Sequence, residues 1–225
     1  MTLKDDFYYK FKKIEKDLLI TTHDFKRYAN YCLPKNLVKN VKNVLSFGIH
    51  DDTKFEDMLL RENKEINLHM YDPTPKTIEY LKTKNYPKNV SFYPVAYAKE
   101  KGKMNFYFDE NHPELCFSLL PLWGDKSKHI TVDTTNLVNI KKENNINYDI
   151  IKADIEGVWY DFCTEVLDNN INFKVLLIEC EMRLLNPEKN LQEYVEIITR
   201  FKEKNFKTYL NRNRDKNISE ILILK

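Results

Sequence analysis

The sequence predicts an α/β protein: a doubly wound, mostly parallel sheet of seven strands with an antiparallel C-terminal strand and a helical N-terminal extension. From residue 44 onward, short apolar runs alternate with amphipathic segments. This alternation is typical of β-α-β units, whose crossovers are right-handed and whose sheets are parallel. The last two apolar runs, Phe206–Leu210 and Ile218–Leu224, are joined only by a short polar segment. They are therefore expected to form an antiparallel pair that closes the sheet.

Residues 1–43 are expected to form a helical extension in front of a main domain at residues 44–225. Apolar side chains recur at helical spacing up to Leu19, and a second helix is expected around Phe25, Tyr28 and Tyr31, ending at Pro34. The extension is interpreted as a helical prefix that packs on the sheet, as a cap over the functional site, or as a basic surface for an anionic substrate. We expect the first of these.

The main domain is expected to contain these elements in order. Strands are predicted at residues 44–47, 68–71, 90–98, 148–154 and 175–178, and helices at 53–63, 158–167 and 187–203. Another helix is predicted to begin at Pro75 with Thr74 as its N-cap, because proline is favoured at the first helical position. Gly102 is predicted to turn a hairpin into residues 104–108. Residues 109–129 interrupt the pattern as a long loop, and residues 130–140 resume it with a strand and a short helix.

Composition excludes several classes of protein. The 36 basic and 34 acidic residues leave a net charge of +2, which gives no global argument for nucleic acid or membrane as a partner. The cysteines Cys32, Cys116, Cys163 and Cys180 are scattered, which disfavours a disulfide framework or zinc site and favours a reducing cytosol. No apolar run reaches the ~18 residues of a membrane span, and the N-terminus lacks a signal-peptide core. We therefore expect a cytoplasmic protein.

Two neighbouring strand ends predict a nucleotide-like ligand. The first strand ends at Gly48, which lets a ligand approach the backbone, and the second ends 24 residues later at Asp72, which can accept hydrogen bonds from ribose hydroxyls. The intervening turn contains Asp51 and Asp52 but no lysine or arginine, so it would repel a pyrophosphate. A cationic, phosphate-free ligand such as S-adenosyl-L-methionine (SAM) suits it better. The alternative is an ordinary strand–turn–helix with one of these aspartates as N-cap.

Carboxylates also follow the later strands. Asp154 and Glu156 follow the strand at residues 148–154, and Glu179 and Glu181 follow the next one. Ligands of open α/β sheets bind at such ends. The group can supply a general base, and four carboxylates can bind Mg²⁺, although no metal is predicted. Alternatively, these side chains pair with surface cations. We take Glu181, Asp154 and Glu179 as the catalytic candidates, with His129 a weaker candidate for the base and Phe117 and Trp123 as possible stacking surfaces for a ring.

Several motifs together resemble the FkbM family of SAM-dependent methyltransferases. They are Phe47-Gly48-Ile49-His50-Asp51-Asp52, Tyr71-Asp72-Pro73-Thr74-Pro75, Val95-Ala96, Lys152-Ala153-Asp154-Ile155-Glu156-Gly157 and Leu177-Ile178-Glu179. The resemblance covers about residues 44–181 and implies a class I, Rossmann-like methyltransferase fold. It also implies that SAM is bound by Gly48, Ile49, His50, Asp51, Asp72, Ala96 and Asp154. His50 stands where the family commonly has a second glycine.

The resemblance implies an enzyme that methylates a hydroxyl of a sugar, glycan or small metabolite. Two alternatives stay open. A nucleic-acid methyltransferase is suggested by the basic N-terminus together with Arg212 and Arg214. A non-catalytic SAM-fold module is suggested by His50 and by Trp159, which replaces an acidic residue of the family pattern.

Overall fold

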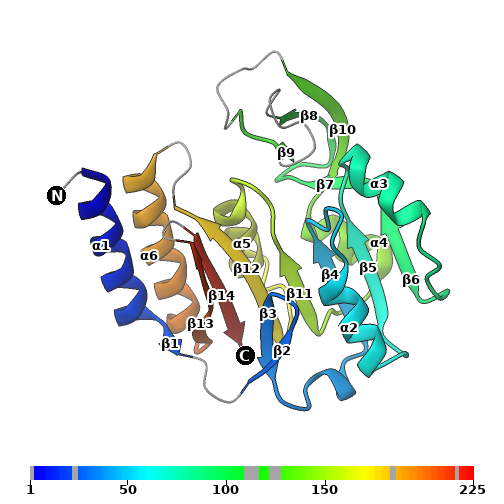
Figure 1. The fold of residues 1–225 in the computed structure, drawn as a ribbon, viewed down its shortest axis with the longest axis horizontal. Helices are drawn as coiled ribbons and strands as arrows, with labels where there is room; N and C mark the ends of the chain where they lie inside the picture. Colours follow the sequence, from blue (N-terminus) through cyan, green and yellow to red (C-terminus); the bar gives the residue numbers. More distant parts are fainter. Residues whose placement is uncertain (1–2, 22–24, 109–116, 122–127, 183–185, 216–217) are drawn as a thin grey trace.

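A computed structural model describes residues 3–21, 25–108, 117–121, 128–182, 186–215 and 218–225 (Figure 1). The helices are α1 (Leu3–Leu18), α2 (Lys54–Glu62), α3 (Pro75–Lys82), α4 (Leu137–Asn144), α5 (Trp159–Asp168), α6 (Pro187–Glu203) and the 3₁₀ turn η1 (Val38–Asn40). The strands of the main sheet are β1 (Ile20–Thr21), β4 (Asn43–Phe47), β5 (Asn67–Tyr71), β6 (Val90–Tyr93), β11 (Ile150–Ala153), β12 (Val175–Glu181), β13 (Lys207–Asp215) and β14 (Ile218–Leu224).

The main sheet has the spatial order β1-β13-β14-β12-β11-β4-β5-β6. Only β14 runs antiparallel to its neighbours, since every other pair in this sheet is parallel. This confirms the predicted doubly wound, mostly parallel sheet with an antiparallel C-terminal strand. The predicted seven strands become eight within the described chain, because the two-residue strand β1 of the N-terminal segment pairs with β13.

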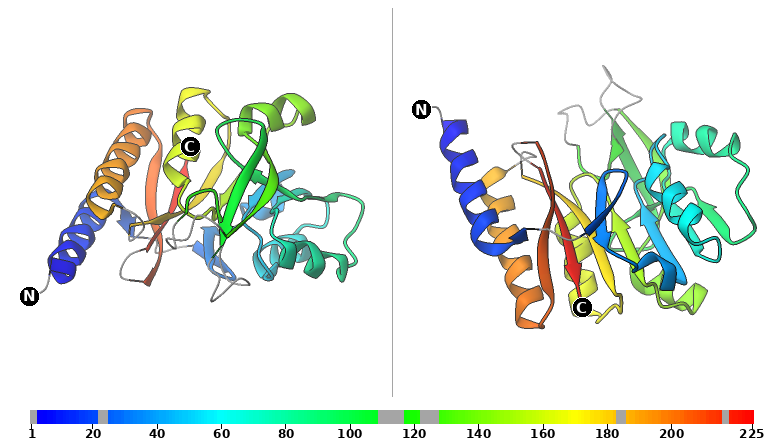
Figure 2. Two further views of the ribbon diagram at one scale, coloured as in Figure 1. Left: turned by 90° about the horizontal axis from the view of Figure 1, so that it is seen from above. Right: turned by 60° about the horizontal axis from the view of Figure 1, so that its bottom comes forward.

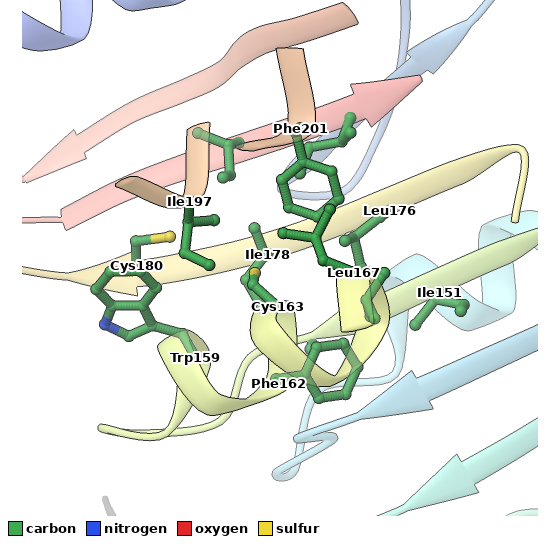
Figure 3. Packing of buried hydrophobic residues seen from close by; sticks show 14 of the residues in the cluster. Ile151, Trp159, Phe162, Cys163, Leu167, Leu176, Ile178, Cys180, Ile197 and Phe201 are labelled. Atoms are coloured by element: carbon green, nitrogen blue, oxygen red, sulfur yellow. The ribbon is translucent and has the colours of Figure 1, made fainter. Parts of the chain in front are cut away.

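Buried apolar residues cover both faces of the sheet. On one face α1, α4, α5 and α6 pack against the strands, and on the other the N-terminal hairpin, α2 and α3 do so. Figure 3 shows the first face, where Cys163 of α5 points toward Ile178 of β12. Phe162 of the same helix packs on Phe47 of β4, with ring centroids 5.7 Å apart. Helices α1 and α6 lie side by side along one edge (Figure 2), with Phe11 edge-on to Tyr194 at 5.7 Å between ring centroids.

The second helix expected in the N-terminal extension is instead a β-hairpin. Strands β2 (Phe25–Tyr28) and β3 (Tyr31–Pro34) pair antiparallel, with Tyr28 opposite Tyr31. The prediction was wrong because residues three apart meet across a two-residue turn as they do on a helix face. Ala29, in the turn, adopts a left-handed conformation with φ 49°. The hairpin packs on α2, where Tyr28 donates a hydrogen bond to Glu62 at 2.7 Å.

A second, smaller sheet lies beyond the carboxyl ends of the main strands, at the top of Figure 1. Its order is β7-β10-β8-β9, formed by Val95–Tyr97, His129–Thr135, Gly102–Phe108 and Phe117–Ser118. The predicted single strand at residues 90–98 is therefore two strands in different sheets. Pro94 separates them because it has no N–H to continue the ladder. Gly102 does not turn a hairpin: it begins β8, and β10 lies between β7 and β8.

Most of the remaining predicted elements are confirmed near their expected bounds. The strand predicted at residues 206–210 instead extends to Asp215. Of the long loop predicted at residues 109–129, residues 109–116 and 122–127 lie outside the described residues, and Phe117–Ser118 form β9. Thr74 is the N-cap residue of α3, with Pro75 in its first turn, and α6 spans residues 187–203 as predicted. Glu179 to Glu181, expected just past a strand, are the last residues of β12. The thiols of Cys32, Cys163 and Cys180 are free. None of the described helices is both long and apolar enough to cross a membrane.

Candidate functional site

The strand ends of the main sheet line up because the central strands are in register. Phe47 pairs with both Tyr71 and Ala153, and Ala153 pairs with Ile178. The backbone ladder continues one step further, since Gly48 donates its N–H to Tyr71 O (3.1 Å) and Asp154 donates its N–H to Phe47 O (3.2 Å). The residues that follow β4, β5 and β11 are therefore held side by side at one edge.

A cavity of about 230 Å³ opens at this edge, between the strand ends and the second sheet. Six of the predicted site residues line this cavity: Gly48, His50, Asp72, Ala96, Asp154 and Glu179. Glu156 lines it as well, and the second sheet contributes Phe106, Phe117 and Leu119. Ile49, Asp51 and Glu181 do not line it. Trp123 lies outside the described residues, and His129 lies on β10 away from the cavity wall.

Asp72 is buried, with 5% of its surface exposed, and it organises the loop after β4. Its Oδ2 accepts the N–H groups of Ile49 and His50, both at 2.8 Å. Its Oδ1 accepts the N–H of Thr74 at 2.8 Å and the Thr74 hydroxyl at 2.7 Å. These bonds fill the roughly four acceptor positions of a carboxylate. Ile49 thus contributes a backbone donor, while its side chain is buried in the core.

The loop after β4 needs unusual backbone conformations. His50 has φ 53°, in the left-handed region that glycine adopts without strain. This explains why a second glycine suits the position. Asp51 contacts His50 Nδ1 at 2.6 Å and forms an ion pair with Lys76 Nζ at 2.8 Å. The hydrogen bond from Lys76 holds the pKa of Asp51 below its usual value. The acidic turn is therefore partly neutralised by a lysine of α3, which the sequence of the turn alone did not reveal.

Gly48 is required by the neighbouring strand end. Its φ is +70°, and a Cβ added there would lie 1.7 Å from the carbonyl oxygen of Asp154. The space of the missing side chain is therefore occupied by protein backbone. Gly48 still lines the cavity with its main chain. Its role in the fold is thus visible without any ligand.

A buried lysine, not singled out from the sequence, supports this junction from beneath. Lys152 on β11 is 5% exposed, and its Nζ donates to Gly48 O at 2.5 Å and to Phe47 O at 3.4 Å. It also lies 5.6 Å from the centroid of the Tyr31 ring, within reach of a cation–π contact. A buried ammonium group is costly unless it is paired, so these contacts fix Lys152 against the loop.

The N-terminal hairpin reaches the same junction through Tyr31, whose hydroxyl donates to Asp154 Oδ2 at 3.2 Å. Burial raises the pKa of Tyr31 well above its usual value, and the charge of Asp154 adds to this effect, followed by Glu220, Glu179 and Glu56. Tyr31 therefore stays a neutral donor. The extension packs on the sheet as expected, and it also supplies a side chain that holds a residue of the cavity wall.

A buried carboxyl group, that of Glu181, lies behind the cavity next to Glu156. Glu181 is 2% exposed, and its Oε2 accepts the Gly157 N–H at 2.7 Å. Burial raises the pKa of Glu181 well above its usual value, and a hydrogen bond to Glu156 and the charge of Glu156 raise it further. Of this pair, Glu156 is the carboxyl group that lines the cavity. The sequence does not distinguish these two positions, because both are expected just past the end of a strand.

Acidic residues do not form a metal site in the described parts of the chain: no group of three or more His, Cys, Asp or Glu residues there is arranged to hold an ion. The four carboxylates Asp154, Glu156, Glu179 and Glu181 lie near one another without sharing such a geometry. Protein contacts engage Asp154 and Glu181, which are bound to Tyr31 and Gly157.

No protein-family model and no curated protein matches the sequence. Among solved structures, similar ones include a candidate caffeoyl-CoA O-methyltransferase from Staphylococcus aureus (13% identity, 97% of this chain and 92% of that chain, TM-score 0.49). Another is Aeropyrum pernix fibrillarin with bound SAM (10% identity, 85% and 70%, TM-score 0.48). A human methyltransferase 10 domain containing protein also matches (7% identity, 97% and 81%, TM-score 0.48). At these values the similarities fix neither activity nor substrate, and the fold assignment rests on the strand order itself.

Proposed function

We propose that the protein is a SAM-dependent methyltransferase that acts on a hydroxyl group of a sugar or small metabolite. One observation carries the proposal: a cavity at the carboxyl ends of β4, β5 and β11 is bounded by Gly48, Asp72 and Asp154. It lies in a sheet whose only antiparallel strand, β14, is inserted between β12 and β13. A mostly parallel doubly wound sheet with an antiparallel last strand is the layout of class I methyltransferases, and ligands of open α/β sheets bind at this edge.

The chemistry of the cavity wall fits SAM. Asp72 is the predicted partner of the ribose hydroxyls. Thr74 now occupies part of Oδ1, but its hydroxyl has Thr77 Oγ1 at 2.6 Å as an alternative partner, so an acceptor position on Asp72 can be released. Ala96 is small and 4% exposed, so it leaves room for the adenine ring of SAM. Asp154 offers a carboxylate to the ammonium group of SAM. When bound, SAM supplies a methyl group activated by its sulfonium.

Three carboxylates on the wall are candidates for the base that takes the proton of the acceptor hydroxyl: Asp154, Glu156 and Glu179. Such a base contributes roughly 10²–10⁴-fold to a rate. Glu181, expected from the sequence to act directly, lies behind Glu156 and is proposed to position it. The rest of the rate enhancement is expected from alignment of the acceptor and exclusion of water, because a fixed geometry is worth about 7–11 kcal/mol.

Calorimetric titration with SAM and with S-adenosylhomocysteine tests the proposal. Wild-type protein is expected to bind both, and Asp72→Asn to bind them at least about tenfold more weakly, because hydrogen bonds to a charged group contribute about 1.5–3 kcal/mol. Asp149→Asn is the matched control. Asp149 also accepts two backbone N–H groups, but at the opposite end of the sheet, where β11 begins. Folded wild-type protein that gives no heat with either ligand would refute the proposal.

A further inference from the structure

The second sheet gives the cavity an apolar, aromatic wall. Phe106 and Phe117 stack with ring centroids 5.6 Å apart and an interplanar angle of 25°. Both line the cavity with Leu119, and Phe117 also packs against Phe108 at 5.2 Å. Side chains arranged in this way bind flat, apolar parts of a ligand.

Carboxylates stand next to this aromatic wall. The hydroxyl of Ser118, the residue after Phe117, donates to the carbonyl oxygen of Glu156 at 2.7 Å and accepts the N–H of Leu120 at 3.0 Å. Ser118 is 1% exposed, so this junction is internal. It fixes the strand β9 against the loop after β11, which carries Asp154 and Glu156. A ligand lying on Phe117 is therefore held close to negative charge.

Lysine and arginine side chains are missing from the part of this cavity wall that the structure describes. The nearby Lys152 directs its Nζ at the carbonyl oxygens of Gly48 and Phe47, and Lys76 is paired with Asp51. An anion in the cavity would therefore be taken out of water with no counter-charge from these residues, which is unfavourable.

Three of the backbone donors that could replace a cation are also occupied. Strand-to-helix loops of α/β sheets usually bind anions through free N–H groups. Here the N–H groups of Ile49 and His50 are donated to Asp72, and the N–H of Gly157 is donated to Glu181. The protein's own carboxylates thus occupy these three donors, so a phosphate or carboxylate of a ligand that has no cationic group beside it, as the carboxylate of SAM has, would find none of the three free.

We propose that the methyl acceptor is an uncharged or cationic molecule with a flat apolar ring, and that acceptors carrying a phosphate or carboxylate near the reacting group are rejected. That the ligand is a methyl acceptor rests on the proposed function, but the charge preference is a property of the cavity alone. Nucleotides, nucleic acids and acyl-CoA compounds are disfavoured by it, whereas amines, phenols and neutral glycosides with an apolar face are favoured.

Three probes of one shape test the preference: benzylamine, benzyl alcohol and benzoate, at neutral pH, followed by ligand-observed NMR with and without S-adenosylhomocysteine. We expect the amine and the alcohol to bind, and benzoate to bind at least about tenfold more weakly. Phe117→Ala is expected to weaken binding of the amine and the alcohol. Glu156→Gln is expected to weaken the binding of benzylamine selectively and so to reduce the difference in affinity between benzylamine and benzoate. Glu143→Gln, an exposed residue of α4 paired with Lys101, is the matched control and leaves all three unchanged.

Benzoate binding as tightly as benzyl alcohol would overturn the proposal, and so would no binding of any probe up to about 10 mM, the weak end of the range for such small ligands. An unchanged difference in affinity between benzylamine and benzoate in Glu156→Gln would also overturn it. The two proposals fail separately. Absence of binding by S-adenosylhomocysteine counts against the methyltransferase, while the order of the three probes is read on the protein alone.

Discussion

Replacing Gly48 with alanine is expected to destabilise the fold strongly. The new Cβ would lie 1.7 Å from the carbonyl oxygen of Asp154, far inside contact distance, and the obstructing atom is backbone. The φ of +70° adds about 1–2 kcal/mol for a residue with a Cβ. Relief of the overlap by moving β4 away from β11 adds roughly 1–3 kcal/mol, as for other overpacked cores. The expected loss is therefore about 2–5 kcal/mol, out of the roughly 5–15 kcal/mol of a typical domain.

The measurement is urea unfolding followed by circular dichroism, with the midpoint and slope fitted separately. Gly102→Ala is the matched control, because a Cβ there meets nothing within 4 Å. It is expected to change the stability by less than about 0.5 kcal/mol. A Gly48→Ala protein within about 1 kcal/mol of wild type would show that the close approach of Gly48 and Asp154 is not a feature of the folded protein.

Two further predictions concern buried charge. Lys152→Met is expected to cost about 1–3 kcal/mol in the same unfolding assay, because it leaves the carbonyl oxygens of Gly48 and Phe47 without their donor. Lys103→Met, at an exposed ion pair with Asp133, should stay within about 0.5 kcal/mol, and equal effects of both would contradict the assignment. Burial lowers the pKa of His69, so as pH falls below about 6.5 the unfolded chain takes up a proton before the folded protein does. The free energy of unfolding should therefore fall by up to about 1.4 kcal/mol per pH unit. The contribution of this residue should vanish in His69→Gln, and an unchanged slope of the free energy of unfolding against pH in that variant would refute the prediction.

The core of the fold could be predicted from sequence because its signals are local. Alternating apolar runs identify β4, β5, β11 and β12, and a proline in the first turn identifies the beginnings of α3 and α6. Two features could not be predicted. The spacing of Tyr28 and Tyr31 fits a helix face and a hairpin equally well. The separation of β7 from β6 depends on long-range pairing with β10, which leaves only Pro94 as a local trace.

The candidate site was predicted in outline, since the residues after parallel strands meet at one edge. What could not be predicted was which way each carboxylate faces. Glu179 and Glu181 lie two apart on β12, yet only Glu179 lines the cavity. The role of Lys152 could not be predicted either. A lysine in a strand gives no sign that its ammonium group will donate to a carbonyl oxygen of a neighbouring strand end. Tyr31 comes from a segment 123 residues away from its partner Asp154.

The break at Pro94 separates the main sheet, which ends with β6, from the small sheet, which begins with β7. Strands β4, β5 and β11 provide the edge where SAM is proposed to bind, whereas β8 and β9 belong to the separate small sheet that carries Phe106 and Phe117. Substitutions in β8 and β9 can thus remodel one wall without disturbing the register of the other. In such a chain, acceptor specificity can change while the binding site for the methyl donor is kept.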